Sequence, residues 1–133
     1  MKKGRLLARI VFLLYLAAVL YLCFGNFSDM SSVAKHFLGI ESDKVVHFLM
    51  FLPFPILFYM AFGWRTRNPW HSMLMVLAIL ALGCLIAAGT ELVQELIPYR
   101  AADIADFMAD FLALCIASTV TFFVDQNKTT RHA

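Results

Sequence analysis

Four long apolar stretches alternate with shorter polar segments along the chain. They run from about residue 6 to 24, 44 to 62, 72 to 94 and 106 to 124. Each is close to the ~20 apolar residues that a helix needs to cross the hydrocarbon core of a bilayer. In lipid such a stretch must be helical, because its backbone groups find no water to bond. The pattern predicts an all-α membrane protein with four transmembrane helices, forming a single domain over residues 1–133.

Composition supports a membrane protein and excludes several other classes. Of the 133 residues, 62% are hydrophobic and 15% are charged. A soluble domain carries about 45–50% apolar and about 25% charged residues. This excess excludes a soluble globular enzyme and a disordered tail, and the net charge of +2 is too small for a nucleic-acid-binding module. We therefore expect the lipid bilayer, and no nucleic acid, as a partner.

The basic residues predict the orientation of the spans. With both termini in the cytoplasm (N-in/C-in), eight basic residues lie inside: Lys2, Lys3, Arg5, Arg9, Arg65, Arg67, Lys128 and Arg131. Three lie outside: Lys35, Lys44 and Arg100. Cytoplasmic loops carry an excess of Lys and Arg, so this arrangement is favoured. All acids except Asp125 then lie at the outer ends of the spans or in the outer loops, and the inner halves of the spans are expected to be uniformly apolar.

Two local features refine this picture. The first outer loop, residues 25–43, is long for a connector. A short amphipathic helix is expected there on the membrane surface, capped by Ser31 or Ser32, running to Phe37 and ended by Gly39. Pro53 and Pro55 are expected to kink the second span.

Polar residues gather at the predicted outer ends of the last three spans. The groups are Asp43, Lys44 and His47; Glu91, Gln94 and Glu95; and Asp103, Asp106 and Asp110. Spacings of three, four and seven residues place the members of a group on one helix face. Small residues continue these faces into the membrane: Gly83, Ala87, Ala113 and Ala117. Because such residues let helices approach closely in lipid, we expect the polar groups to face the bundle interior.

The charges in this predicted pocket do not balance. Six acids share it with two basic residues, Lys44 and Arg100, and a charge at membrane depth costs at least ~2.5–3.5 kcal/mol. A wet pocket, protonated acids or a bound cation would each relieve the excess. Simpler roles exist for some members: Asp43 can cap a helix, and Asp103 with Asp106 fits a capping box. Arg100 can neutralise an acid or hold a phosphate or carboxylate group.

Four residues are candidates for catalysis or for metal binding: His47, Glu91, Asp106 and Asp110. Carboxylates and imidazole act as general acids and bases, and they also hold divalent cations. Oxygen ligands with a single imidazole suit Mg²⁺ or Mn²⁺ better than a closed zinc site. The wider set expected to bind a ligand is Asp43, Lys44, His47, Glu91, Gln94, Arg100, Asp103, Asp106 and Asp110.

The same residues carry a resemblance to a known family. The ordered blocks DKxxHFxxF, ExxQ and RxxDxxDxxxD, here at 43–51, 91–94 and 100–110, resemble the VanZ-like family of small bacterial membrane proteins. The namesake of that family is associated with low-level resistance to the glycopeptide antibiotic teicoplanin. The resemblance therefore implies a multi-pass protein of the bacterial cytoplasmic membrane with a role in the cell envelope.

Three functions remain open. The first is a VanZ-type protein whose outward-facing pocket binds or alters an envelope component, such as a headgroup or a lipid-linked precursor, and so lowers susceptibility to teicoplanin. The second is a membrane-embedded enzyme, metal-dependent or not, acting on a lipid-linked envelope substrate. The third is a small transporter, which is disfavoured because the acids gather at one end of the spans. The sequence leaves the reaction and the oligomeric state undetermined.

Overall fold

The computed structural model describes residues 2–25, 36–37, 40–64, 66–99 and 102–130. Its elements are α1 (Lys2–Phe24), β1 (His36–Phe37), β2 (Ile40–Glu41), α2 (Ser42–Phe51), α3 (Phe54–Phe62), α4 (Pro69–Glu95) and α5 (Ile104–Thr130). Four segments are long and apolar enough to cross a membrane: Lys3–Phe24, Asp43–Phe62, Pro69–Glu95 and Ile104–Lys128. The predicted helical class and its four spans are confirmed, and the last two helices extend beyond their predicted limits.

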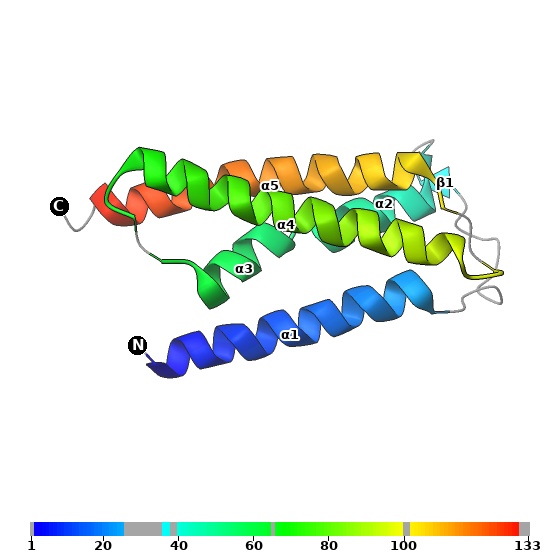
Figure 1. Ribbon diagram of the computed structural model, residues 1–133, viewed down its shortest axis with the longest axis horizontal. Coiled ribbons are helices and arrows are strands. Elements are labelled where there is room, and N and C mark those ends of the chain that lie inside the picture. The colour runs from blue at the N-terminus through cyan, green and yellow to red at the C-terminus, as the bar shows by residue number, and fades with distance from the viewer. Residues whose placement is uncertain (1, 26–35, 38–39, 65, 100–101, 131–133) are drawn as a thin grey trace.

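The long helices α4 and α5 run antiparallel and pack against each other along most of their length (Figure 1). Helix α2 packs on α5, whereas α1 packs mainly on α3. The start of α2, the end of α4 and the start of α5 meet at one end of the bundle (Figure 1). We call this the His47 end; the start of α1 and the end of α5 lie at the opposite end.

Proline interrupts the second span between α2 and α3. Residues 52–53 form a turn, and Pro55 lies in the first turn of α3. Pro55 has no N–H to donate to the carbonyl of Phe51, so the helix cannot continue through this point. Beside the interruption, the hydroxyl of Tyr15 on α1 donates to the carbonyl of Met50 at 2.6 Å. The expected kink of the span is therefore a full break of the helix, and α1 supplies a hydrogen bond to the backbone beside it.

The expected helix in the first loop lies mostly outside the described residues. Only its last two residues, His36 and Phe37, are described, and they are not helical. They form β1, which pairs antiparallel with β2. The paired residues are His36 with Glu41 and Phe37 with Ile40. The pairing gives the backbone N–H and C=O groups of this segment hydrogen-bond partners directly before α2. A helix ending at Phe37 would not pair with Ile40–Glu41 in this way. The predicted helix is therefore wrong at this end.

Large apolar side chains cover the outside of the bundle. Exposed examples occur on every long helix, including Leu14, Leu77, Leu85, Leu92 and Phe123. A continuous apolar surface of this kind is rare on a soluble monomer and marks a site of association or membrane contact. The surface is compatible with direct contact with lipid.

Small residues let α4 and α5 approach closely. Ala87 of α4 and Ala113 of α5 are fully buried, as the predicted stripes require. Gly83 lies against Leu114 and Phe54. A methyl group added to Gly83 would come within 2.7 Å of Leu114 Cδ2 and 3.2 Å of Phe54 Cδ1. Because both neighbours are fully buried, neither can easily move away.

Replacing Gly83 by alanine is therefore expected to lower the thermal unfolding temperature in detergent. Alanine is the better helix former by about 1 kcal/mol, but overpacking of a filled core costs about 1–3 kcal/mol. Gly89→Ala on the same helix is the matched control, because nothing lies within 4 Å of the position of its added Cβ. Equal unfolding temperatures for the two variants would contradict close packing at Gly83.

Candidate functional site

Three helix ends bring the predicted polar groups together at the His47 end. Helix α2 supplies Asp43, Lys44 and His47, the end of α4 supplies Glu91, and the start of α5 supplies Asp103, Asp106 and Asp110. The assembly follows from the antiparallel packing of α4 on α5, with α2 lying on α5 beside them. Helical spacing keeps the side chains of each group on the face that packs inward.

His47 lies at the centre of this assembly and is held by Asp110. The two side chains are 3% and 0% exposed. Nδ1 of His47 lies 3.1 Å and 3.3 Å from the two carboxylate oxygens of Asp110. An ionised carboxylate can only accept, so Nδ1–H donates to Asp110, and in the neutral ring Nε2 then keeps a free lone pair. The hydrogen bond therefore fixes the orientation of the ring and, when the ring is neutral, its tautomer.

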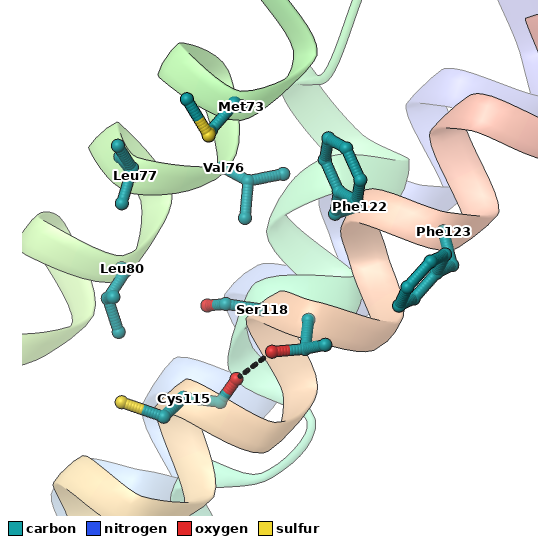
Figure 2. Close-up of a pocket in the computed structure, with 9 residues that line it drawn as sticks. Met73, Val76, Leu77, Leu80, Cys115, Ser118, Phe122 and Phe123 are labelled. Atoms are coloured by element: carbon teal, nitrogen blue, oxygen red, sulfur yellow. Dashed lines mark hydrogen bonds between the residues drawn. The ribbon is translucent and has the colours of Figure 1, made fainter. Parts of the chain in front are cut away.

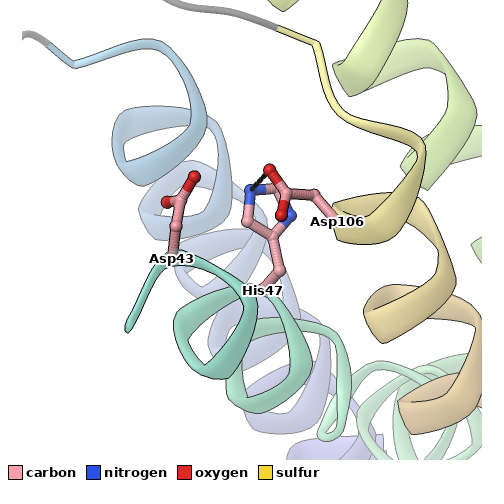
Figure 3. Close-up of side chains that lie close together, drawn as sticks. All are labelled: Asp43, His47 and Asp106. Carbon is pink, nitrogen blue, oxygen red and sulfur yellow. Dashed lines mark ion pairs between the residues drawn. The ribbon is translucent and has the colours of Figure 1, made fainter. Parts of the chain in front are cut away.

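The other ring nitrogen faces a second carboxylate. Nε2 of His47 lies 4.0 Å from Oδ2 of Asp106, and Figure 3 shows the ring between Asp106 of α5 and Asp43 of α2. Ligand atoms of Asp43, His47 and Asp106 all lie within 4.8 Å of one another. Asp43 is exposed, whereas His47 and Asp106 are buried. This triad is thus open to a ligand on one side and closed on the other.

Glu91 completes a second triad on the opposite side of the ring. Its Oε1 lies 3.8 Å from Nδ1 of His47. Ligand atoms of His47, Glu91 and Asp110 also all lie within 4.8 Å of one another. Oε2 of Glu91 accepts a hydrogen bond from the backbone of Asp103 at 3.2 Å. Oε1 of Glu91 and Oδ1 of Asp106 are buried and have no hydrogen-bond partner among the described residues. Each triad therefore contains one buried oxygen without a donor.

Lys44 and Asp103 form the outer rim of the cluster. Nζ of Lys44 lies 3.2 Å from Oδ2 of Asp103 and 3.8 Å from Oδ1 of Asp106. Oδ1 of Asp103 accepts from the backbone N–H of Ala105, which caps the start of α5. This backbone bond, and the bond from Lys44, hold the pKa of the Asp103 carboxyl below its usual value. Asp103 thus has a structural role, and Lys44 offsets only part of the acid charge.

Of the two remaining predicted ligand-binding residues, Gln94 and Arg100, only Gln94 is described, and it bonds another part of the bundle. Nε2 of Gln94 donates to the backbone carbonyl of Cys23 at 2.8 Å, a buried bond that ties α4 to α1. The side-chain amide thereby contacts α1. Arg100 lies outside the described residues. Glu95, also counted in the predicted pocket, is exposed at the end of α4.

The donor set determines what this cluster can do chemically. Four carboxylates, those of Asp43, Glu91, Asp106 and Asp110, surround a single imidazole. Within the described residues, four carboxylates, three of them buried, beside a single lysine are strongly unfavourable, so the two oxygens without a hydrogen bond call for a proton or a further cation. Hard divalent cations take carboxylate oxygens, and a ligating histidine normally donates its other N–H to a carboxylate. The His47–Asp110 pair provides such an arrangement.

A second buried polar cluster, at the opposite end of the bundle, was missed by the sequence analysis. Asp125 is fully buried and accepts hydrogen bonds from Tyr59 at 2.7 Å and from Thr66 at 2.6 Å. Thr66 and Asp125 lie just outside the predicted spans, which end at about residues 62 and 124, so the cluster borders the inner halves that were expected to be apolar. No spacing rule could have found the cluster, because its members come from α3, the α3–α4 connection and α5.

The sequence is similar to a known family over most of its length. The family model VanZ/LLP1 matches residues 12–125. An uncharacterized protein of fission yeast, Schizosaccharomyces pombe, named C11E3.10, is 33% identical over 76 residues, which are 57% of this chain and 44% of the yeast protein. The chain thus spans less than half of that relative. No solved structure matches the chain. Because the family model covers more than three quarters of its residues, the chain belongs to the VanZ/LLP1 family.

Proposed function

We propose that this protein is a multi-pass membrane protein of the cell envelope that holds a divalent cation at Asp43, His47 and Asp106. Through the cation it binds the polar headgroup of an envelope component. Family membership supports the membrane and envelope setting, and the cluster at the His47 end supports the chemistry.

The single observation that carries the proposal is the position of the His47 ring between two carboxylates. Asp110 occupies Nδ1 at 3.1 Å and leaves Nε2, which carries a lone pair in the neutral ring, facing Asp106. Carboxylates in this outer position orient metal-binding histidines and raise their basicity. Two ligating acids with a neutral imidazole supply two negative charges, which match Mg²⁺ or Mn²⁺. The exposure of Asp43 leaves room for a further ligand on the cation.

The distribution of basic residues supports the location of the site. With both termini in the cytoplasm, the His47 end faces outward, toward the cell envelope. We place the protein in the bacterial cytoplasmic membrane on the basis of its resemblance to VanZ. The fission yeast relative indicates that similar sequences are not confined to bacteria.

Detergent-purified protein is expected to bind Mn²⁺ or Mg²⁺ and to unfold several degrees higher in its presence. A ligand at about one hundred times its Kd stabilises the folded state by about 2.7 kcal/mol. Asp106→Asn and Asp43→Asn should abolish this shift, because each removes a ligating charge. Elemental analysis and thermal unfolding with and without a chelator measure the effect.

Two variants serve as controls for the cation site. Glu95→Gln removes an exposed acid near the end of α4 and should keep the full thermal shift. Glu91→Gln should also bind the cation, because Glu91 belongs only to the triad at Nδ1. An unchanged shift in Asp106→Asn would refute the site, and loss of the shift only in Glu91→Gln would move the cation to the second triad.

We further propose a role in antibiotic susceptibility, which the resemblance to VanZ supports. Expression in a teicoplanin-sensitive bacterium is expected to raise the concentration of teicoplanin that stops growth, because a bound or altered envelope component reduces access to the antibiotic's target. Asp106→Asn should remove the effect, and Glu95→Gln should keep it. Unchanged susceptibility, with wild-type protein present in the membrane fraction, would contradict this role.

A membrane-embedded enzyme is the alternative, and the unpartnered Oε1 of Glu91 favours it. This buried oxygen lies 3.8 Å from Nδ1 of His47, and with no hydrogen-bond donor among the described residues it is available to accept a proton from a water that attacks the substrate. Glu91→Gln should then keep cation binding but lose turnover of a labelled phospholipid presented with Mn²⁺. Equal product formation by the wild type and Glu91→Gln would exclude Glu91 as the base.

A further inference from the structure

Two apolar hollows lie along the contact between α4 and α5. The first, of about 300 Å³, adjoins the His47 cluster and is lined by Ala88, Glu91, Leu92, Asp103, Ile104 and Phe107. The second, also of about 300 Å³, lies farther along the same two helices. Figure 2 shows Leu77 and Leu80 of α4 on one side of it and Cys115 and Phe122 of α5 on the other. The hydroxyl of Thr119 in this wall is bonded within its own helix, to the carbonyl of Cys115 at 2.9 Å.

Both hollows follow one seam between the helices. On α4 the residues Leu77, Leu80, Cys84, Ala88 and Glu91 succeed one another at steps of three and four. On α5 the same steps join Ile104, Phe107, Phe111, Cys115, Ser118 and Phe122. Such steps keep residues on one helix face. At a rise of 1.5 Å per residue, the seam from Leu77 to Glu91 is about 21 Å long, most of the ~30 Å hydrocarbon thickness of a bilayer.

The seam is open to the lipid side and ends at the cluster. Leu77, Leu92 and Ile104 along it are exposed, so a hydrocarbon chain can enter from the side without crossing water. Glu91 belongs both to the wall of the first hollow and to the triad around His47. Asp103 in the same wall pairs with Lys44, whose Nζ lies 3.8 Å from Oδ1 of Asp106, so the first hollow borders the cation triad as well.

We propose that the ligand of this site is a membrane lipid with a phosphate headgroup, which enters sideways between α4 and α5. Its phosphate meets the cation at Asp43, His47 and Asp106, and its hydrocarbon chain lies along the seam. The identification of the headgroup rests on the proposed cation site, because Mg²⁺ and Mn²⁺ bridge protein carboxylates and phosphate oxygens. Without the cation, the carboxylates would repel a phosphate, so lipid binding and cation binding are coupled.

The test compares two phosphate ligands that differ only in their hydrocarbon. Dioleoyl phosphatidate carries the phosphate on a two-chain lipid, and glycerol phosphate carries the phosphate alone. Binding to the purified full-length chain in detergent is measured by native mass spectrometry, with Mn²⁺ and with a chelator. Phosphatidate is expected to bind at least about tenfold more tightly than glycerol phosphate, since burial of only a few methylene groups suffices for that factor. Chelation should weaken phosphatidate binding by a similar factor.

A matched pair of variants tests the seam itself. Ala88→Trp fills the first hollow, whereas Ala78→Trp adds the same bulk at an exposed position of α4 that lines neither hollow. Ala88→Trp should weaken phosphatidate binding at least about tenfold and leave Mn²⁺ binding unchanged, and Ala78→Trp should alter neither. Leu92→Asn places a polar group in the same hollow and supplies the same comparison should the tryptophan variant fail to fold.

The outcomes separate this inference from the cation site. If Mn²⁺ binds but Ala88→Trp and Leu92→Asn both match Ala78→Trp in phosphatidate affinity, the seam is overturned and the cation site stands. Glycerol phosphate binding as tightly as phosphatidate would overturn the seam as well. If Mn²⁺ does not bind and the variants at Ala88 or Leu92 still weaken phosphatidate binding selectively, the seam stands and the cation site fails.

Discussion

The buried hydrogen bond between His47 and Asp110 is the interaction on which the arrangement of the His47 end depends. Asp110 has no exposed surface, and a carboxylate so placed is tolerable only with a strong partner. The imidazole is that partner, at 3.1 Å. Because Nδ1 of the ring bonds Asp110, Nε2 is held toward Asp106 and Asp43. The bond that makes the buried acid tolerable therefore also orients the group that faces the open side of the cluster.

Helix packing is what brings these groups to the same depth. Gly83, Ala87 and Ala113 let α4 and α5 approach closely, so Glu91 reaches the backbone of Asp103 and stands beside His47. The break before α3 lets α2 take its own direction along α5, and Tyr15 bonds the carbonyl of Met50 beside it. Close packing in the membrane and polar chemistry at its surface are thus two results of the same helix contacts.

Much of this could be predicted from the sequence, because it depends on local periodicity. Apolar length gave the four spans, and steps of three and four residues put Asp106 and Asp110 on one face with the small residues below them. Contacts between distant segments were not predictable in this way. Gln94 looks like a pocket residue by its spacing from Glu91, yet it bonds the backbone of Cys23 on α1. Asp125 looks like the polar end of a span, yet Tyr59 and Thr66 bury it. At His36–Phe37, strand pairing outweighed the capping signals that favoured a helix.

The two buried polar clusters are separated by tightly packed apolar residues. On α5, the next buried polar side chain after Asp110 is that of Ser118, eight residues and about 12 Å farther along the helix. Leu114 lies between them and, with Phe51 and Phe54, is at most 1% exposed. Thr121 directs its hydroxyl to its own helix, at the carbonyl of Ala117. Within the described residues, therefore, the clusters are not joined by polar side chains, as a path for ions through a single chain would require. A site that is polar at one end and bordered by an apolar seam is better suited to hold an amphiphile at the membrane surface than to pass a solute across it.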